Sequence, residues 1–438
     1  MKNNKTNLTK ELFIPVFNFI KKKKYEEALN LLEKLLDQNQ NPDIINKLKG
    51  SVYLNQKKWK HSLLNYQKIS ENKINFEIAN NMGVALYKLG RFSEASIKFK
   101  QSINNNNSYI PAYENFCVTN KILGNYDLSI KFSLKALKLM PTNNKLKNNL
   151  IDIFNYYEPK NDENSILKTN NQIRKLNLEN QKNKLIQISN INEILNKSQE
   201  IIENSNLTFN YPNTQIFKKN TINLNCERHL DIFSNYKIIP KFCFNCYKVQ
   251  ITLNNVLDLL KLYFYFNNLT LKKNNTRKCI IELRNNIVGN YKGYIFTDTI
   301  VEAKNILNII SKDLVNKEIE LKKIEIKHGC TEYYDDFKIY KDIDKDVVDK
   351  IYQDKWMYIE KKYDEKNLIL ENNNERVFND TLKVFNLSDF LIIKNWLLYA
   401  KIIGDNTYEK IYKFNLNTNQ LSQSEMEKIS LRKKDLFN

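Results

Sequence analysis

Residues 81–95 read Asn81-Met-Gly-Val-Ala-Leu-Tyr-Lys-Leu-Gly-Arg-Phe-Ser-Glu-Ala95, and this stretch decides the fold of the first third of the chain. Its second aromatic residue belongs to a series spaced 34, 33 and 34 positions apart, namely Tyr25, Trp59, Phe92 and Tyr126. Three positions after each of these four aromatic residues comes a small residue: Ala28, Ser62, Ala95 and Ser129. A repeat of this period predicts stacked helical hairpins, in which the small residue lets two helices approach closely.

The quoted stretch, together with Leu123-Gly-Asn-Tyr-Asp-Leu-Ser129, resembles the tetratricopeptide repeat. The resemblance covers about residues 9–157, with clear repeats at 76–109 and 110–143, a weaker one at 43–75 and a partial first one interrupted at Pro15. It implies an all-α superhelix whose concave groove holds peptides or partner proteins. Six residues face this groove if the helices are in register: Lys47, Asn80, Tyr87, Lys88, Glu114 and Lys121.

Positive charge is concentrated in the same region. The 438-residue chain has 69 Lys and Arg against 49 Asp and Glu, and residues 1–150 alone hold 25 against 11. A basic groove favours an acidic ligand or a C-terminal carboxylate. The alternative is that the repeats only make the chain rigid.

Composition and charge divide the chain into four predicted segments. They are helical repeats at 1–157, a helical cap and connector at 158–225, a Cys- and His-rich α+β domain at 226–341, and a helical C-terminal region with a charged tail at 342–438. Residues 209–219 of the connector read as an extended loop. No apolar run reaches the roughly 18 residues of a membrane span. With no recognisable secretory signal, we expect a cytoplasmic protein that does not enter a membrane.

The α+β assignment comes from the spacing of apolar residues. Alternation predicts strands at 246–253, 279–284, 292–298 and 320–328, and helical spacing predicts helices at 255–267 and 300–314. This βαββαβ order is that of ferredoxin-like domains, in which the first strand lies between the third and fourth. The arrangement predicts that Cys246, Cys279 and Cys330 lie along one end of the sheet.

The cysteines suggest a metal site. Cys226-x2-His229 and Cys243-x2-Cys246 offer four soft ligands in two close pairs, which suits a structural, tetrahedral zinc ion held from tight turns. Cys330 or His328 could replace His229. The alternative is that Cys243 and Cys246 are packing residues and His229 a solvated one.

Two other function classes compete with a protein-binding scaffold. Lys292-Gly-Tyr-Ile-Phe-Thr297 partly matches an RNA-recognition strand, in which Tyr294 and Phe296 would stack on bases. An enzyme of unrecognised class in the Cys- and His-rich domain is the other alternative, with Cys330 and His328 as a conceivable nucleophile and base. No oxyanion loop or Gly-rich phosphate motif accompanies them.

Overall fold

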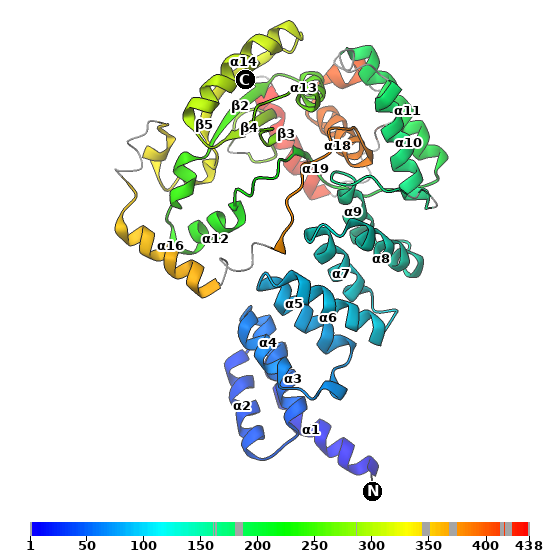
Figure 1. The fold of residues 1–438 in the computed structure, drawn as a ribbon, viewed down its shortest axis with the longest axis vertical. Helices are drawn as coiled ribbons and strands as arrows, with labels where there is room; N and C mark the ends of the chain where they lie inside the picture. The colour runs from blue at the N-terminus through cyan, green and yellow to red at the C-terminus, as the bar shows by residue number, and fades with distance from the viewer. Residues whose placement is uncertain are drawn as a thin grey trace. The chain divides into compact units, whose positions relative to one another are not determined.

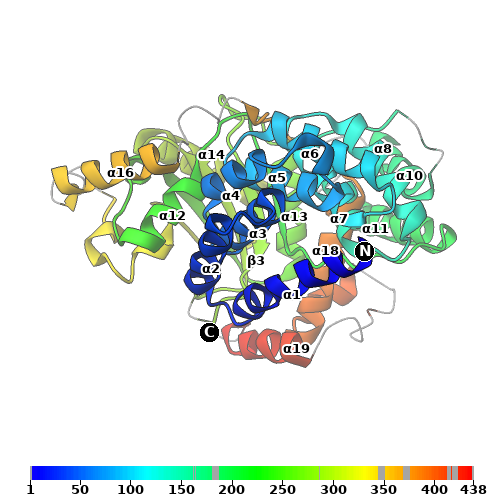
Figure 2. The same cartoon turned by 90° about the horizontal axis from the view of Figure 1, so that it is seen from below.

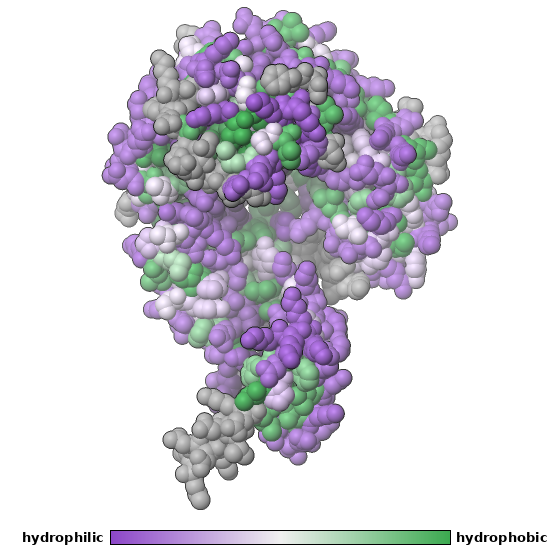
Figure 3. Space-filling view, turned by 180° about the vertical axis from the view of Figure 1, so that it is seen from behind, coloured by the Kyte–Doolittle hydropathy of each residue, from purple (hydrophilic) through white to green (hydrophobic). Residues whose placement is uncertain are grey.

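A computed structural model describes the chain from residue 2 to 436, apart from 161, 163, 180–186, 286, 344–350, 368–374, 412–415 and 417–422. The fold divides into two compact units. The first comprises Met1–Asn149 and Asp364–Val377, and the second comprises Leu150–Tyr363 and Phe378–Asn438. Among the described residues, no helix combines the length and hydropathy that a membrane span needs. Hydrophilic residues cover most of the face seen in Figure 3.

The first unit is a stack of antiparallel helical hairpins (Figures 1 and 2). Its helices are α1 (Lys2–Lys21), α2 (Tyr25–Asp37), α3 (Pro42–Asn55), α4 (Trp59–Gln67), the 3-10 turn η1 (Glu71–Lys73), α5 (Phe76–Lys88), α6 (Phe92–Asn105), α7 (Ile110–Ile122) and α8 (Tyr126–Leu139). The next helix, α9 (Asn144–Ile153), begins in the first unit and ends in the second. Each of the four periodic aromatic residues is the first residue of the second helix of a hairpin, so the predicted tetratricopeptide-type superhelix is confirmed.

Close packing inside each hairpin depends on a pair of residues 16 positions apart. A Cβ built on Gly83 would lie 2.6 Å from the Phe99 ring, and one built on Gly50 would lie 2.7 Å from the Tyr66 ring. In the fourth hairpin, α7 and α8, the glycine becomes Cys117, and the residue 16 positions later is the small Ser133 rather than an aromatic. Cys117, which is larger than glycine, fits here because Ser133 is smaller than the aromatic residue at the same position of the other hairpins.

The second unit is built around one five-stranded sheet. The strands are β1 (Gln215–Lys218), β2 (Tyr247–Leu253), β3 (Arg277–Ile281), β4 (Tyr291–Thr297) and β5 (Leu321–His328). They lie in the order β1-β3-β4-β2-β5, and every neighbouring pair is antiparallel. The predicted sheet with helices is thus present, with one strand more than expected.

The remaining helices of the described chain are α10 (Ser165–Glu179), α11 (Ile188–Asn204), α12 (Cys226–Tyr236), α13 (Val256–Asn268), α14 (Ile300–Asn316), α16 (Asp354–Asn367), α18 (Leu387–Ile403) and α19 (Gln423–Ser430). All lie in the second unit except the last residues of α16, which belong to the first. Short 3-10 turns are η2 (Lys241–Asn245), η3 (Thr331–Tyr333), η4 (Lys338–Lys341), η6 (Asn406–Lys410) and η8 (Leu431–Leu436). Helices α13 and α14 pack on the sheet, and α18 packs on α13 and β1.

Three expectations for this unit need correction. The predicted loop 209–219 contains β1, which pairs with β3 through Gln215 to Lys218. The alternation at 246–253 is typical of a strand with one polar, solvated face, but the polar residues of β2 are buried, as Lys248 and Gln250 are each 7% exposed. Cys279 pairs with Gly293, which pairs with Ile251, so Cys279 lies near the middle of the sheet rather than at the Cys246 end. Strand β3 begins two residues earlier than predicted, and this moves Cys279 along the sheet.

Candidate functional site

The predicted groove residues lie on the first helices of successive hairpins in the first unit. Lys47 lies on α3, Asn80 on α5 and Glu114 on α7. The Lys47 Nζ is 3.1 Å from a Glu77 carboxylate oxygen on α5. The side chain of Asn80 accepts a 3.0 Å hydrogen bond from Asn115 of α7. Side chains of three consecutive first helices are therefore linked by contacts, and the predicted groove residue Asn80 is itself buried.

The remaining groove residues differ in their availability to a ligand. Tyr87 packs edge-on against Phe92, with ring centroids 5.3 Å apart. Lys88 is exposed and its Nζ lies 5.8 Å from the centre of the Tyr87 ring. Lys121, on α7, is partly buried. Glu114 accepts hydrogen bonds from Lys145, at 2.5 Å, and from Asn143, at 2.9 Å, so its carboxylate is neutralised within the repeats.

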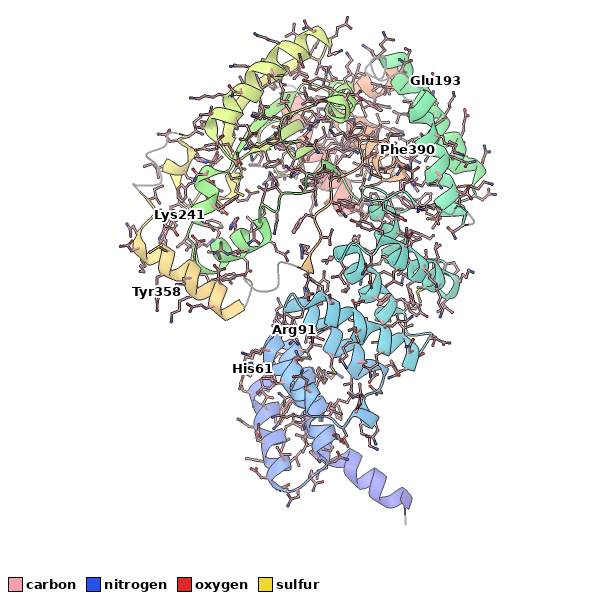
Figure 4. The ribbon with its side chains drawn as sticks, in the orientation of Figure 1. His61, Arg91, Glu193, Lys241, Tyr358 and Phe390 are labelled. Carbon is pink, nitrogen blue, oxygen red and sulfur yellow. The ribbon has the colours of Figure 1, made fainter. Side chains whose placement is uncertain are left out.

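The turns at one end of these helices are contacted by a distant segment of the same unit. The Ser93 backbone N–H donates to the Glu375 carboxylate over 2.8 Å. The Val377 N–H donates to the Ile122 carbonyl over 2.9 Å, and Val377 packs on Gly124. Arg91, labelled in Figure 4 in the turn between α5 and α6, pairs with Glu94 through two 2.6 Å contacts. The segment that holds Glu375 and Val377 therefore covers part of the turns at this end of the helices.

A cluster of thiols forms a second candidate site, in the second unit. Cys243 lies in η2, and Cys246 lies just before β2. Cys330 lies just after β5, and Cys226 is the first residue of α12. The Gly329 N–H donates to the Cys246 carbonyl over 2.7 Å, because β2 and β5 pair at this end of the sheet. Lys241, labelled in Figure 4, marks the start of η2.

The thiols of this cluster affect one another's protonation. A hydrogen bond with Cys330 is the main cause that raises the pKa of Cys243, and the same bond lowers the pKa of Cys330. Burial, together with the nearby Cys330 and Cys226, raises the pKa of Cys246 to about 12. Burial also raises the pKa of Cys226 to about 11, with Cys330 as the next cause.

The two candidate histidines are engaged with aromatic rings. His229 is buried and its ring stacks on Phe242, with centroids 5.2 Å apart. His328 lies between Tyr247 and Tyr340, and its Nε2 is 2.9 Å from the Asp342 carbonyl oxygen. Across the part of the chain that the structure describes, no three His, Cys, Asp or Glu side chains are placed to share one metal ion. The zinc assignment stays a prediction.

Sequence reasoning missed two features of the thiol cluster. Cys226 and His229 lie on a helix, α12, rather than in a tight turn. Tyrosines pack around Cys243, because the Tyr340 hydroxyl donates to its carbonyl over 2.7 Å and the Tyr333 hydroxyl lies 3.5 Å from its sulfur. The tyrosine-rich stretch after Cys330 was the available signal, but nothing local indicated that it folds back onto η2.

The predicted RNA-stacking residues are not equally accessible. Tyr294 is 5% exposed, and the Lys248 and Lys278 ammonium groups lie 5.1 and 5.8 Å from the centre of its ring. Phe296 is partly exposed. Burial, together with the neighbouring cations Lys248 and Arg284, lowers the pKa of Lys278 to about 8. One of the two predicted stacking rings is thus covered.

Comparison with known proteins finds one family model over the repeats. Residues 4–158 match the family model described as the coatomer epsilon subunit. No curated protein matches the chain. The fold of the first unit is established by its own helices and their period.

Three solved structures illustrate the similarity. The second TPR domain of the human RPAP3 protein, in complex with an HSP70 peptide, is 21% identical, with 26% of this chain and 94% of that domain covered and a TM-score of 0.25. YrrB, described as a TPR protein with an unusual peptide-binding site, is 17% identical, with coverages of 43% and 85% and a TM-score of 0.30. MamA from AMB-1 is 16% identical, with coverages of 34% and 82% and a TM-score of 0.30.

Proposed function

We propose that the first unit binds a peptide segment of a partner protein on the groove surface formed by α3, α5 and α7. The observation that supports this proposal is the set of side-chain contacts that hold the three helices together, in which Lys47 meets Glu77 and the buried Asn80 meets Asn115 across neighbouring hairpins. A rigid, preformed surface lowers the ordering cost of binding an extended peptide. The function is therefore that of a protein-interaction scaffold.

The ligand proposed for this groove is acidic or ends in a free carboxylate. Two acidic groups on the surface, Glu77 and Glu114, are already paired with lysines. Lys88 is exposed, and the whole region carries an excess of positive charge. Charge complementarity of this kind sets partner choice and association rate.

The test measures binding of synthetic peptides to the full chain by fluorescence anisotropy. The peptides are an acidic sequence with a free C-terminal carboxylate, the same sequence amidated, and a neutral sequence of the same length. We expect the acidic peptides to bind and their affinity to fall as salt is added. A Lys88→Glu, Lys121→Glu variant is expected to bind at least about tenfold more weakly, which is about 1.4 kcal/mol.

The matched control is a Lys138→Glu variant, which changes the charge of an exposed residue on the second helix α8. It is expected to bind the acidic peptides with nearly unchanged affinity. Equal weakening by both variants would show a general charge effect and contradict a groove site. Tighter binding of the neutral peptide would contradict the acidic ligand.

For the second unit, we propose a ferredoxin-like βαββαβ domain extended by β1 at the edge of its sheet. The strand order supports this, because β2 lies between β4 and β5 and β3 lies beside β4. Its proposed role is to stabilise the scaffold rather than to bind RNA. The proposed location is a reducing compartment such as the cytoplasm, in which thiols persist.

A further inference from the structure

A pocket opens between the second helices of the third and fourth hairpins in the first unit. Helices α6, α7 and α8 pack in succession (Figure 1). The pocket is lined by residues of α6, by the buried ring of Phe116 from α7 and by Leu128 from α8. Its volume is about 490 Å³, which lies within the usual range of sites that take a ligand or a side chain.

Two of the polar side chains that line this pocket are already hydrogen-bonded within the unit. The Ser96 hydroxyl accepts from the Asn120 amide over 3.0 Å. The Gln101 carbonyl oxygen accepts from the Lys98 ammonium group over 3.1 Å. The surface left for a ligand therefore combines apolar groups with the ammonium group of Lys100.

The apolar side chains of the pocket are exposed, although the hairpins do not require them there. Ile97 is 65% exposed and Leu128 is 37% exposed. Leu128 lies two residues after the start of α8, and at this position α2 carries Glu27 and α6 carries Glu94. A second helix of this repeat thus forms without an apolar residue at that place. Exposed apolar side chains that line one pocket are typical of an interaction site.

Positive charge lies beside these apolar groups. The Lys100 Nζ is 3.8 Å from the centre of the Phe132 ring and 5.9 Å from that of Phe116. Burial, together with the nearby Lys135 and Lys131, lowers the pKa of Lys100. Among the described residues, none of these three ammonium groups is paired with a carboxylate. A carboxylate supplied by a ligand would offset their mutual repulsion.

We propose that this pocket is a second binding site of the first unit, which takes an apolar side chain of a partner protein with an acidic side chain next to it. The apolar side chain lies against Ile97, Phe116 and Leu128, and the carboxylate pairs with Lys100. Charge complementarity favours an acidic partner over a second copy of this chain, whose formal net charge is +20. The proposed groove residues lie on first helices, whereas this pocket is formed mainly by second helices, so the two sites are separate.

Peptide selection on the full chain tests this proposal. A phage-displayed library of random peptides is selected on the parent after removal of phage that bind the Leu128→Glu variant. This variant gives α8 the glutamate that α2 and α6 carry at the same position, so we expect it to fold, and circular dichroism checks this. Enriched sequences should combine an apolar residue with acidic residues.

Fluorescence anisotropy with an enriched peptide, synthesised with both ends capped, separates the pocket from the groove. Lys100→Met removes the charge and keeps an apolar side chain, and it should weaken binding at least about tenfold, as should Leu128→Glu. Lys60→Met is the matched control, because it makes the same substitution on α4, the second helix of another hairpin. It should leave the affinity nearly unchanged. The Lys88→Glu, Lys121→Glu groove variant should also bind this peptide nearly as the parent does.

Four results would overturn the proposal. The selection could enrich no peptide that prefers the parent to Leu128→Glu. An enriched peptide that binds Lys100→Met like the parent would contradict an acidic partner. A peptide that loses as much affinity for the groove variant as for Lys100→Met would belong to the groove. A concentration-dependent dimer of the parent in light scattering, abolished by Leu128→Glu, would identify a second copy of the chain as the occupant.

Discussion

The two units differ in how far apart in sequence the residues are that make their decisive contacts. In the first unit the contacts that shape each hairpin join residues close in sequence, such as Gly83 and Phe99. In the second unit the decisive contacts join distant residues, such as Lys218 and Asp389, which are 171 positions apart. Local contacts between apolar groups are sensitive to side-chain volume, whereas buried ion pairs are sensitive to the loss of either partner. The two units should therefore be destabilised by different kinds of substitution.

The largest effect is expected at the buried ion pair of the second unit. Asp389 is fully buried, its carboxylate lies 3.0 Å from the Lys218 Nζ, and it accepts a 2.7 Å hydrogen bond from Tyr263. Asp389→Ala leaves a buried ammonium group without its partner, and we expect the second unit to lose about 3–5 kcal/mol of unfolding free energy. Hydrogen exchange of the full chain, read on peptides from α18 and β1, measures the loss, while peptides from α5 should be unchanged.

A double variant tests whether the unpaired charge of Lys218 causes the expected loss of stability in Asp389→Ala. Lys218→Met with Asp389→Asn removes both charges and keeps an oxygen for the Tyr263 hydroxyl. It should be clearly more stable than Asp389→Ala. Equal instability of the two variants would show that packing of α18, rather than the unpaired charge, dominates.

A smaller effect is expected in the repeats. Gly83→Cys places a side chain against the Phe99 ring, and we expect a loss of about 1–3 kcal/mol from overpacking. Urea unfolding followed by circular dichroism measures it. Adding Phe99→Ser recreates the Cys117 and Ser133 combination of the fourth hairpin, so the double variant should lose less than the sum of the two single variants. Simple additivity would mean that the two positions are not coupled.

The smallest effect concerns Lys278 and depends on pH. Burial lowers its pKa to about 8 in the folded chain, whereas an unfolded lysine titrates near 10.4. Lys278→Met should therefore raise the stability of the second unit by about 1–2 kcal/mol at pH 7, where the parent holds a charged, partly buried ammonium group. Between pH 8 and about 10 the folded parent loses this proton before the unfolded chain does. The parent then gains stability, and the difference in unfolding free energy between the parent and Lys278→Met becomes smaller.

Unfolding curves of parent and variant at pH 7, 8, 9 and 10 test this prediction. Lys272→Met, at an exposed residue shortly before β3, is the control and should show no pH-dependent difference. A gap between parent and Lys278→Met that stays constant with pH would show that the effect is one of packing.

The repeat hairpins and the order of strands and helices could be predicted because their signals are local. The four aromatic residues mark the start of the second helix in each hairpin. The predicted helices at 255–267 and 300–314 correspond to α13 and α14. Strand β1 was missed because four residues flanked by irregular backbone carry too short a pattern, and its partner β3 lies more than fifty residues further along the chain.

For the candidate sites, the sequence was enough to show which residue types are available and to predict which helices carry the proposed groove residues. Only the tertiary structure decided which of them meet. It places Glu114 against Lys145 and Tyr294 beneath two lysines, and it brings Cys330 to Cys243. The periodicity of a helix or strand can be recognised from residues close in sequence. The approach of η2 to the end of β5 depends instead on how whole elements pack. That packing minimises the free energy of the complete unit and leaves no trace in any short stretch of sequence.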